Sequence, residues 1–351
     1  MKTKKAATFY AVLAAALYAI NIPLSKVLLN HIEPTMMASF LYLGAGVGLL
    51  FYGLAEKFSG KKSKREALTK KELPYTVAMV VLDIAAPILL MFGITMTSSA
   101  NVSLLNNFEI VATSIIALVV FKEIVSKRLW IAIMLVTVAS VILSFEGKSS
   151  FEFNKGSLLV LGACLCWGLE NNCTKMISNK NSIEIVVIKG FFSGLGSLAV
   201  ALCIGESLPP LKWLVCVMIL GFVAYGLSIH FYIMAQKELG AAKTSAYYSV
   251  APFLGVIFSV IILSERPTMQ FYVALTIMIV STVIMVKDSI SLQHTHEHEH
   301  IHTHEHRHGD TVHIHEHTHT HTHLHVHGND SENHQHNHEL TNHRHNHSIN
   351  E

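Results

Sequence analysis

Long apolar stretches joined by short polar connections make up most of the chain. Ten stretches each hold about 20 mostly apolar residues, the length that a helix needs to cross the hydrocarbon core of a bilayer. They lie at roughly 6–29, 36–55, 75–97, 102–121, 128–145, 156–178, 183–204, 211–235, 242–263 and 269–286. The pattern therefore predicts an all-α polytopic membrane protein with ten transmembrane helices.

Composition agrees with this class and excludes others. Hydrophobic residues make up 51% of the 351 positions and charged residues only 14%, whereas soluble domains carry roughly 25% charged residues. The net charge of +2 does not favour a nucleic-acid partner. The five cysteines lie in apolar stretches, so we expect buried thiols and no disulfide framework. No hydrolase, kinase or redox motif occurs, so we do not expect an enzyme.

Lysine and arginine placement predicts the orientation in the membrane. With the N-terminus inside, the inner connections and termini of the apolar region collect 17 basic residues, and the outer connections hold 4. Cytoplasmic loops of membrane proteins are enriched in basic residues. We therefore expect a protein of the cytoplasmic membrane with both termini in the cytoplasm.

The two halves of the apolar region resemble each other. The segment "YAINIPLSK" at 18–26 matches "WGLENNCTK" at 167–175, and "FKE" at 121–123 matches "LSE" at 263–265. Each half has five spans, an odd number, so the two copies of a repeat would insert with opposite orientations. The alternative is that the ten helices are unrelated. Inverted repeats predict a substrate site near the midplane between the copies. The predicted domains are 1–146 with a basic cytoplasmic loop at 56–73, then 147–290, and then a tail at 291–351.

These segments, together with "LVVFKEIVSKRLWIAIMLVTVASVIL" and "APFLGVIFSVIILSERPTMQFYVALTIMIVSTVIM", resemble the EamA-type members of the drug/metabolite transporter superfamily. The resemblance covers about residues 6–287 and none of the tail. It implies a carrier whose central cavity is lined by spans 1–4 and 6–9, with spans 5 and 10 peripheral. The acidic residues that close spans 4 and 9 in this family correspond to Glu123 and Glu265. The resemblance does not identify a substrate.

Polar side chains within the spans are the candidates for the substrate cavity. A charged side chain costs roughly 2.5–3.5 kcal/mol at the centre of a membrane helix, so such groups usually face a cavity or a partner. With the aromatic residues at matching positions of the two halves, the expected cavity residues are Tyr18, Asn21, Asp83, Asn106, Glu109, Trp167, Glu170, Asn171, Lys189, His230 and Tyr247. Asn106 and Glu109 are three residues apart and would share one helix face.

The roles of several of these residues have more than one interpretation. Lys189 would neutralise Glu170, bind an anionic group of the substrate, or extend along the helix to the inner surface. His230 is expected to be a hydrogen-bonded packing residue, with a proton-carrying or ligand role as the alternative. Cys166, Glu170 and Cys173 share a face and could bind a metal, although cysteine also serves as a small packing residue. Prolines within spans at positions 23, 87 and 252 would be hinges or static kinks.

The tail has a different chemistry from the rest of the chain. Residues 291–351 contain 22 of the 24 histidines, and from "HTHEHEHIHTHEHRHGD" at 294–310 onward histidine occupies alternate positions. Few apolar residues occur, so we expect a disordered segment and no strand. Neutral imidazole binds Zn, Ni, Co and Cu, and protonation near pH 6.5 would release them. The alternative is a low-complexity expansion with incidental binding. The predicted ligands are His294, His296, His298, His300, His302, His304, His306, His308, His313, His315, His317, His319, His321, His323, His325 and His327.

The sequence predicts a membrane transporter that works by alternating access on a small solute, a metabolite or an amino-acid-like compound. Two alternatives remain: a carrier of divalent transition metals that the tail loads or regulates, and a membrane-anchored metal buffer. The expected partners are the lipid bilayer, a small-molecule substrate and divalent metal ions. We expect no required cofactor. A homodimer is a further possible partner.

Overall fold

A computed structural model describes residues 2–58, 68–121, 126–145, 154–177, 180–239, 244, 247–308 and 311–326. The chain divides into two compact units, Met1–Gln293 and His294–Glu351. Within the described residues, all regular elements of the first unit up to Leu292 are helical. Its elements are α1 (Lys2–Ala19), α2 (Asn21–Leu28), α3 (Pro34–Phe58), the 3₁₀ turn η1 (Lys70–Glu72), α4 (Leu73–Met96), α5 (Ser99–Leu105), α6 (Phe108–Phe121), α7 (Lys127–Ser144), α8 (Lys155–Met176), α9 (Ser182–Ile188), the π-helical segment η2 (Lys189–Ser193), α10 (Gly194–Cys203), α11 (Leu211–Gly221), the π-helical segment η3 (Phe222–Leu227), α12 (Ser228–Leu239), α14 (Ala251–Leu263) and α15 (Met269–Leu292).

Helices long and apolar enough to cross a bilayer recur along this unit. By length and composition, the described residues contain eight such helices: Lys5–Leu28, Pro34–Ala55, Lys70–Met96, Ser99–Val120, Lys127–Ser144, Ile183–Cys203, Leu211–Ala235 and Met269–Asp288. A shorter apolar helix spans Ala251–Leu263. The chain is therefore a polytopic helical membrane protein. Its many exposed apolar side chains, such as Phe51 and Val119, suit contact with lipid.

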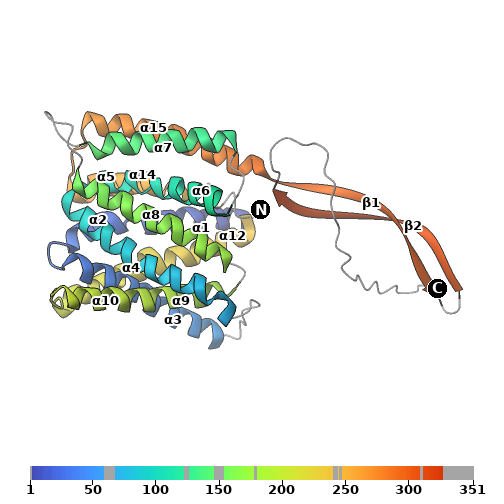
Figure 1. The fold of residues 1–351 in the computed structure, drawn as a ribbon, viewed down its shortest axis with the longest axis horizontal. Coiled ribbons are helices and arrows are strands. Elements are labelled where there is room, and N and C mark those ends of the chain that lie inside the picture. Colours follow the sequence, from blue (N-terminus) through green and yellow to red (C-terminus); the bar gives the residue numbers. More distant parts are fainter. Residues whose placement is uncertain are drawn as a thin grey trace. The chain divides into compact units, whose positions relative to one another are not determined.

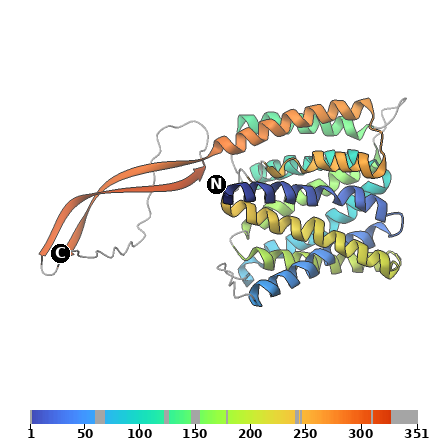
Figure 2. The same ribbon diagram turned by 180° about the vertical axis from the view of Figure 1, so that it is seen from behind.

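The helices form one bundle around a buried core. Figure 1 shows α7 and α15 lying side by side at one edge of the bundle, and Figure 2 shows the same pair from behind. Helix α3, near the opposite edge, packs against both α10 and α11, while α8 packs against α4 and α6. The buried core contains residues from both halves of the chain, including Met36, Leu90 and Val160.

Side chains satisfy the backbone groups at several helix ends, which fixes where those helices begin and end. Ser126 accepts a hydrogen bond from the Leu129 N–H at 3.0 Å and so begins α7. At the C-terminus of α4, the Lys26 ammonium donates to the Ile94 carbonyl and, at 2.8 Å, to the Thr97 carbonyl. Because Lys26 comes from α2, this contact ties the first span to the end of the third.

Three spans are interrupted, and one interruption has a clear cause in the sequence. The first span breaks at Ile20 between α1 and α2. Pro23 lacks the N–H that would bond four residues back, to Ala19, so the helix cannot continue regularly. The fourth span breaks at residues 106–107 between α5 and α6, and a turn at 249–250 precedes α14. Pro87 lies inside α4, which continues through it, whereas Pro252 lies in the first turn of α14, where proline is tolerated.

Two π-helical segments face α3 across glycine contacts. An added Cβ at Gly190, in η2, would lie 2.5 Å from the Cα of Gly46 in α3. An added Cβ at Gly221, just before η3, would lie 2.0 Å from the Leu41 carbonyl oxygen, again in α3. Only glycine permits these backbone approaches. Helix α3 therefore packs directly against the backbones of both spans that contain a π-helical segment.

The structure of the tail differs from the predicted disorder. The second unit contains strands β1 (Gln293–His308) and β2 (Thr311–Val326), which pair as a two-stranded sheet. Disorder was expected because the tail lacks a core, and for these two segments that expectation is wrong. A ladder satisfies backbone groups by strand pairing without a core, and strict alternation of two residue types suits extended backbone. His327 and the residues after it lie outside the described part of the chain.

Candidate functional site

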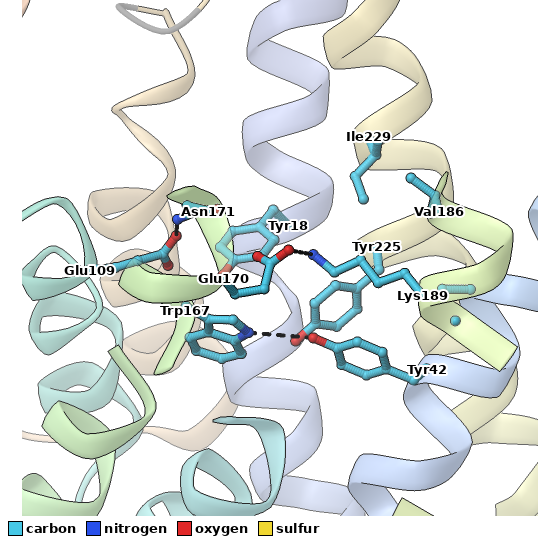
Figure 3. A pocket seen from close by; sticks show the side chains of 12 residues that line it. Tyr18, Tyr42, Glu109, Trp167, Glu170, Asn171, Val186, Lys189, Tyr225 and Ile229 are labelled. Carbon is cyan, nitrogen blue, oxygen red and sulfur yellow. Dashed lines mark hydrogen bonds and ion pairs between the residues drawn. The ribbon is translucent and has the colours of Figure 1, made fainter. Parts of the chain in front are cut away.

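A cavity of about 150 Å³ lies within the helical bundle. Residues from both halves of the chain form its wall (Figure 3). They are Tyr18, Tyr42, Ala45, Glu109, Trp167, Glu170, Asn171, Val186, Lys189, Gly190, Tyr225 and Ile229. The wall therefore combines four aromatic rings with two carboxylates, one ammonium group and one amide.

Lys189 joins two buried acids. Its Nζ lies 3.1 Å from Oδ2 of Asp83 in α4 and 3.0 Å from Oε1 of Glu170 in α8. The Asp83 side chain is fully buried, and that of Glu170 is 2% exposed. The Thr174 hydroxyl, one helical turn beyond Glu170, also donates to its carboxylate. The ammonium group of Lys189 thus points into the bundle and does not extend to the inner surface.

Tyr42 links the acidic pair to the aromatic wall. Its hydroxyl donates to Oδ1 of Asp83 at 3.0 Å and accepts from Nε1 of Trp167 at 3.4 Å. The Tyr42 ring also packs against the ring of Tyr225, with centroids 5.6 Å apart. These contacts hold α3, α4, α8 and η3 in a fixed relation around the cavity.

Glu109 has a different environment from Glu170. Nδ2 of Asn171 donates to Oε1 of Glu109 at 2.7 Å and lies 3.3 Å from the Thr113 hydroxyl. Among the described residues, no lysine, arginine or histidine forms an ion pair with Glu109. The second acid of the cavity wall is therefore held by an amide and not by a cation of the described residues.

Six of the eleven residues predicted for the cavity lie in its wall. They are Tyr18, Glu109, Trp167, Glu170, Asn171 and Lys189. Asp83 and Asn21 lie behind the wall and bond to it: Asp83 pairs with Lys189, and the Asn21 amide donates to the Tyr225 hydroxyl at 3.1 Å.

The other three predicted residues do not line the cavity. Asn106 lies in the turn between α5 and α6 and is not among the residues that line the cavity. His230 packs its ring against Tyr52, with centroids 4.2 Å apart. Tyr247 is 41% exposed. Its neighbour Tyr248 instead packs against Tyr18.

Several wall residues were not predicted. Tyr42 and Tyr225 carry no charge, and aromatic residues are common in membrane helices, so neither differs from a packing residue in the sequence. A buried hydroxyl group needs a partner, but the sequence does not show which tyrosines are buried. Ala45, Val186, Gly190 and Ile229 are ordinary apolar or small residues with no sequence signal.

Metal-ligand sets were also expected. In the part of the chain whose side chains the structure describes, no three His, Cys, Asp or Glu residues are grouped to hold a metal ion. Cys166, Glu170 and Cys173 are all in that part and form no such group, so the alternative in which they bind a metal is not supported. The side chains of the tail histidines lie outside that part of the chain.

The resemblance also singled out two acidic residues, Glu123 and Glu265. Glu123 lies outside the described residues. The Glu265 carboxylate accepts hydrogen bonds from the Ser99 and Ala100 N–H groups at the start of α5.

The sequence model of the EamA-like transporter family matches residues 5–145 and again residues 154–287. The chain belongs to this family. The match covers the helical bundle and none of the tail, as the resemblance predicted. The chain is accordingly a multi-pass membrane transporter, with the lipid bilayer and a small-molecule substrate as its partners.

Two relatives carry the same general description. An uncharacterized transporter from Methanothermobacter thermautotrophicus is 26% identical over 268 residues, which cover 72% of this chain and 78% of the relative. The uncharacterized transporter YyaM from Bacillus subtilis (strain 168) is 21% identical over 257 residues, 67% of this chain and 79% of the relative.

The fold has a counterpart among solved structures. A chain whose structure is described only as the crystal structure of a protein superposes with a TM-score of 0.60 at 14% identity. The superposition covers 82% of this chain and 97% of the other. At this identity the likeness concerns the fold alone.

Proposed function

We propose that the protein is a secondary carrier that moves a small organic solute, a metabolite or an amino-acid-like compound, by alternating access. The observation that carries this proposal is the cavity inside the bundle, whose wall draws aromatic and ionisable side chains from both halves of the chain. Small-molecule sites combine an apolar, aromatic lining with a few placed polar groups. Intramembrane ionisable residues mark substrate pathways.

The proposed architecture is ten spans arranged as two inverted five-helix repeats. The eight long apolar helices become ten when α8, which has 22 residues, and α14 are added. Support for the repeat comes from the two consecutive family matches. It also comes from hydroxyl caps at equivalent positions: Ser126 accepts from the Leu129 N–H, and Thr268 accepts from the Phe271 N–H at 3.3 Å.

The fourth and ninth spans support the repeat in a second way. When "FKE" at 121–123 is aligned with "LSE" at 263–265, the turn at 106–107 falls at 248–249, beside the turn at 249–250. An interrupted helix at the same place in both halves is typical of carriers, in which broken helices border the substrate site. Glu109 lies just after the first of these interruptions.

We place the carrier in the cell membrane with both termini in the cytoplasm. The proposal rests on the excess of lysine and arginine in the connections that would lie inside. An epitope fused to the C-terminus tests it: the epitope should react with antibody only after the cells are permeabilised. Reaction on intact cells would reverse the orientation.

The tail is proposed to be a metal-binding accessory on the cytoplasmic side. The proposal rests on the sequence, in which histidine occupies alternate positions from 294 to 308. A cluster of imidazoles favours Zn, Ni, Co and Cu. We do not favour transport of these metals through the bundle, because no histidine or cysteine of the described residues lines the cavity.

A ligand-dependent melting screen tests the proposed substrate class. The screen would use the helical unit alone, residues 1–290, with metabolites and divalent metals side by side. An increase in melting temperature with an organic solute, lost in Glu170→Gln, supports the proposal. Stabilisation by nickel or zinc alone would favour the metal carrier instead.

A further inference from the structure

The cavity contains more negative than positive groups. Glu109 and Glu170 line it, Asp83 lies directly behind, and the one ammonium group in contact with any of them among the described residues is that of Lys189. If all four groups are charged, one positive charge faces three negative charges. An unbalanced charge in a medium of low dielectric constant is costly unless a counter-charge arrives or the carboxyl group binds a proton. The imbalance therefore favours a cationic ligand.

The aromatic wall favours the same ligand. Rings of Tyr18, Tyr42, Trp167 and Tyr225 line the cavity that Glu170 also lines (Figure 3). Organic cations are attracted to aromatic faces, most strongly in desolvated sites. Neither feature would help to bind an anion.

In the structure, Lys189 forms an ion pair with Glu170, the acid that such a ligand would need. Glu170 lines the cavity, but its Oε1 lies 3.0 Å from the Lys189 ammonium. Asp83 does not line the cavity, is fully buried and is fixed by the Tyr42 hydroxyl. Lys189 could therefore leave Glu170 and remain paired with Asp83. Release of Glu170 would not leave the ammonium group alone in the membrane, which keeps its cost low.

We propose that Lys189 is an internal counter-ion which a substituted ammonium group of the substrate displaces from Glu170. This inference rests on the proposed function and names the substrate class of the same cavity: a small organic amine with an apolar or aromatic body. Lys189 is then a specificity-determining residue that competes with the substrate. It does not bind an anionic group of the substrate.

Two probes of opposite charge test the inference by isothermal titration on the full chain in lipid nanodiscs. They are phenethylammonium and phenylacetate, each with one aromatic ring and one charged group. The amine should bind the wild type, and Glu170→Gln should abolish binding. Glu238→Gln, a matched change at an exposed acid of α12, should leave binding unchanged.

The decisive variant is Lys189→Met combined with Asp83→Asn, which removes both members of the Lys189–Asp83 pair. Glu170 then has lost its cation and keeps the hydrogen bond from the Thr174 hydroxyl. If Lys189 occupies Glu170 about nine-tenths of the time, its removal should tighten amine binding about tenfold. Weaker or unchanged amine binding in this variant would overturn the proposal. Binding of phenylacetate that is lost in the variant would also overturn it, because Lys189 would then bind anions.

Failure of the carrier proposal would look different. An amine that binds as described but is not taken up by proteoliposomes would support the site and contradict transport. Uptake of an anion through the same cavity would support transport and contradict the role of Lys189.

Discussion

The Glu265 carboxylate accepts a hydrogen bond from the backbone N–H of Ser99 at 2.8 Å. One residue follows the ninth span and the other begins the fourth, so the bond joins the two halves of the chain. The same carboxylate accepts from the next N–H, at 2.9 Å, and the Ser98 hydroxyl accepts from the third. All three N–H groups at the start of α5 are therefore satisfied, two of them by an acid from the other half.

Loss of this carboxylate should loosen the contact between the halves. Glu265→Ala removes two charge-assisted hydrogen bonds and the favourable interaction with the helix N-terminus, a loss of about 1–3 kcal/mol of stability. Glu265→Gln keeps one acceptor and should cost less. Melting temperatures in detergent would rank the variants as wild type, glutamine, alanine. Equal melting of all three would mean that the contact contributes nothing.

The buried pair of acids around Lys189 predicts an asymmetry between two substitutions. Lys189→Met leaves Asp83 and Glu170 without a cation and should cost about 3–5 kcal/mol. Asp83→Asn leaves one ammonium group paired with one carboxylate, so its cost should be smaller. Melting temperatures of the two variants at neutral pH would measure the difference. A larger loss for Asp83→Asn would contradict the geometry at Lys189.

Charged residues within the apolar stretches were the feature of the sequence that indicated the site. Glu109, Glu170 and Lys189 are costly in lipid, so each needs a cavity or a partner, and all three line the cavity. Asn106 was expected in the cavity wall as well, but it lies in the turn between α5 and α6 and is not among the lining residues. Tyr225 was not found because a buried tyrosine and a lipid-facing one look the same in a sequence.

The π-helical segments and the tail were not predictable in the same way. In the π-helical segment η2, Gly190 packs against Gly46, and an apolar sequence indicates neither this contact nor the π-helical turn. The tail was expected to be disordered because composition measures the ability to form a core. It does not measure the ability of two alternating segments to pair as β1 and β2.

The close approach of η2 to α3 predicts a position that tolerates no side chain. In Gly190→Ala the new Cβ would lie 2.5 Å from the Cα of Gly46, so backbone must move, at a cost of about 1–3 kcal/mol. The matched control is Gly162→Ala in α8, where the nearest atom is a flexible side-chain carbon of Leu89 at 3.5 Å. Thermal unfolding should separate the two variants. Equal stability would show that α3 and η2 are not in contact.

The tail should bind metal independently of the bundle, because the two are separate compact units. The full chain should bind several Zn²⁺ or Ni²⁺ ions in a titration, and residues 1–290 should bind none with comparable affinity. Protonation of imidazole competes with metal, so binding should be present above about pH 6.5 and be lost as the pH falls below it. Binding that survives at acidic pH would point to ligands other than histidine.

The central claim is that a small organic solute crosses the membrane through the cavity bordered by Glu170. The most direct measurement is uptake into proteoliposomes of a radiolabelled solute that stabilises residues 1–290 in the melting screen. Residues 1–290 should take up the solute, and the same protein with Glu170→Gln should not, although Glu238→Gln remains active. Equal uptake by the Glu170→Gln protein, or uptake of Ni²⁺ or Zn²⁺ in place of any organic solute, would contradict the account.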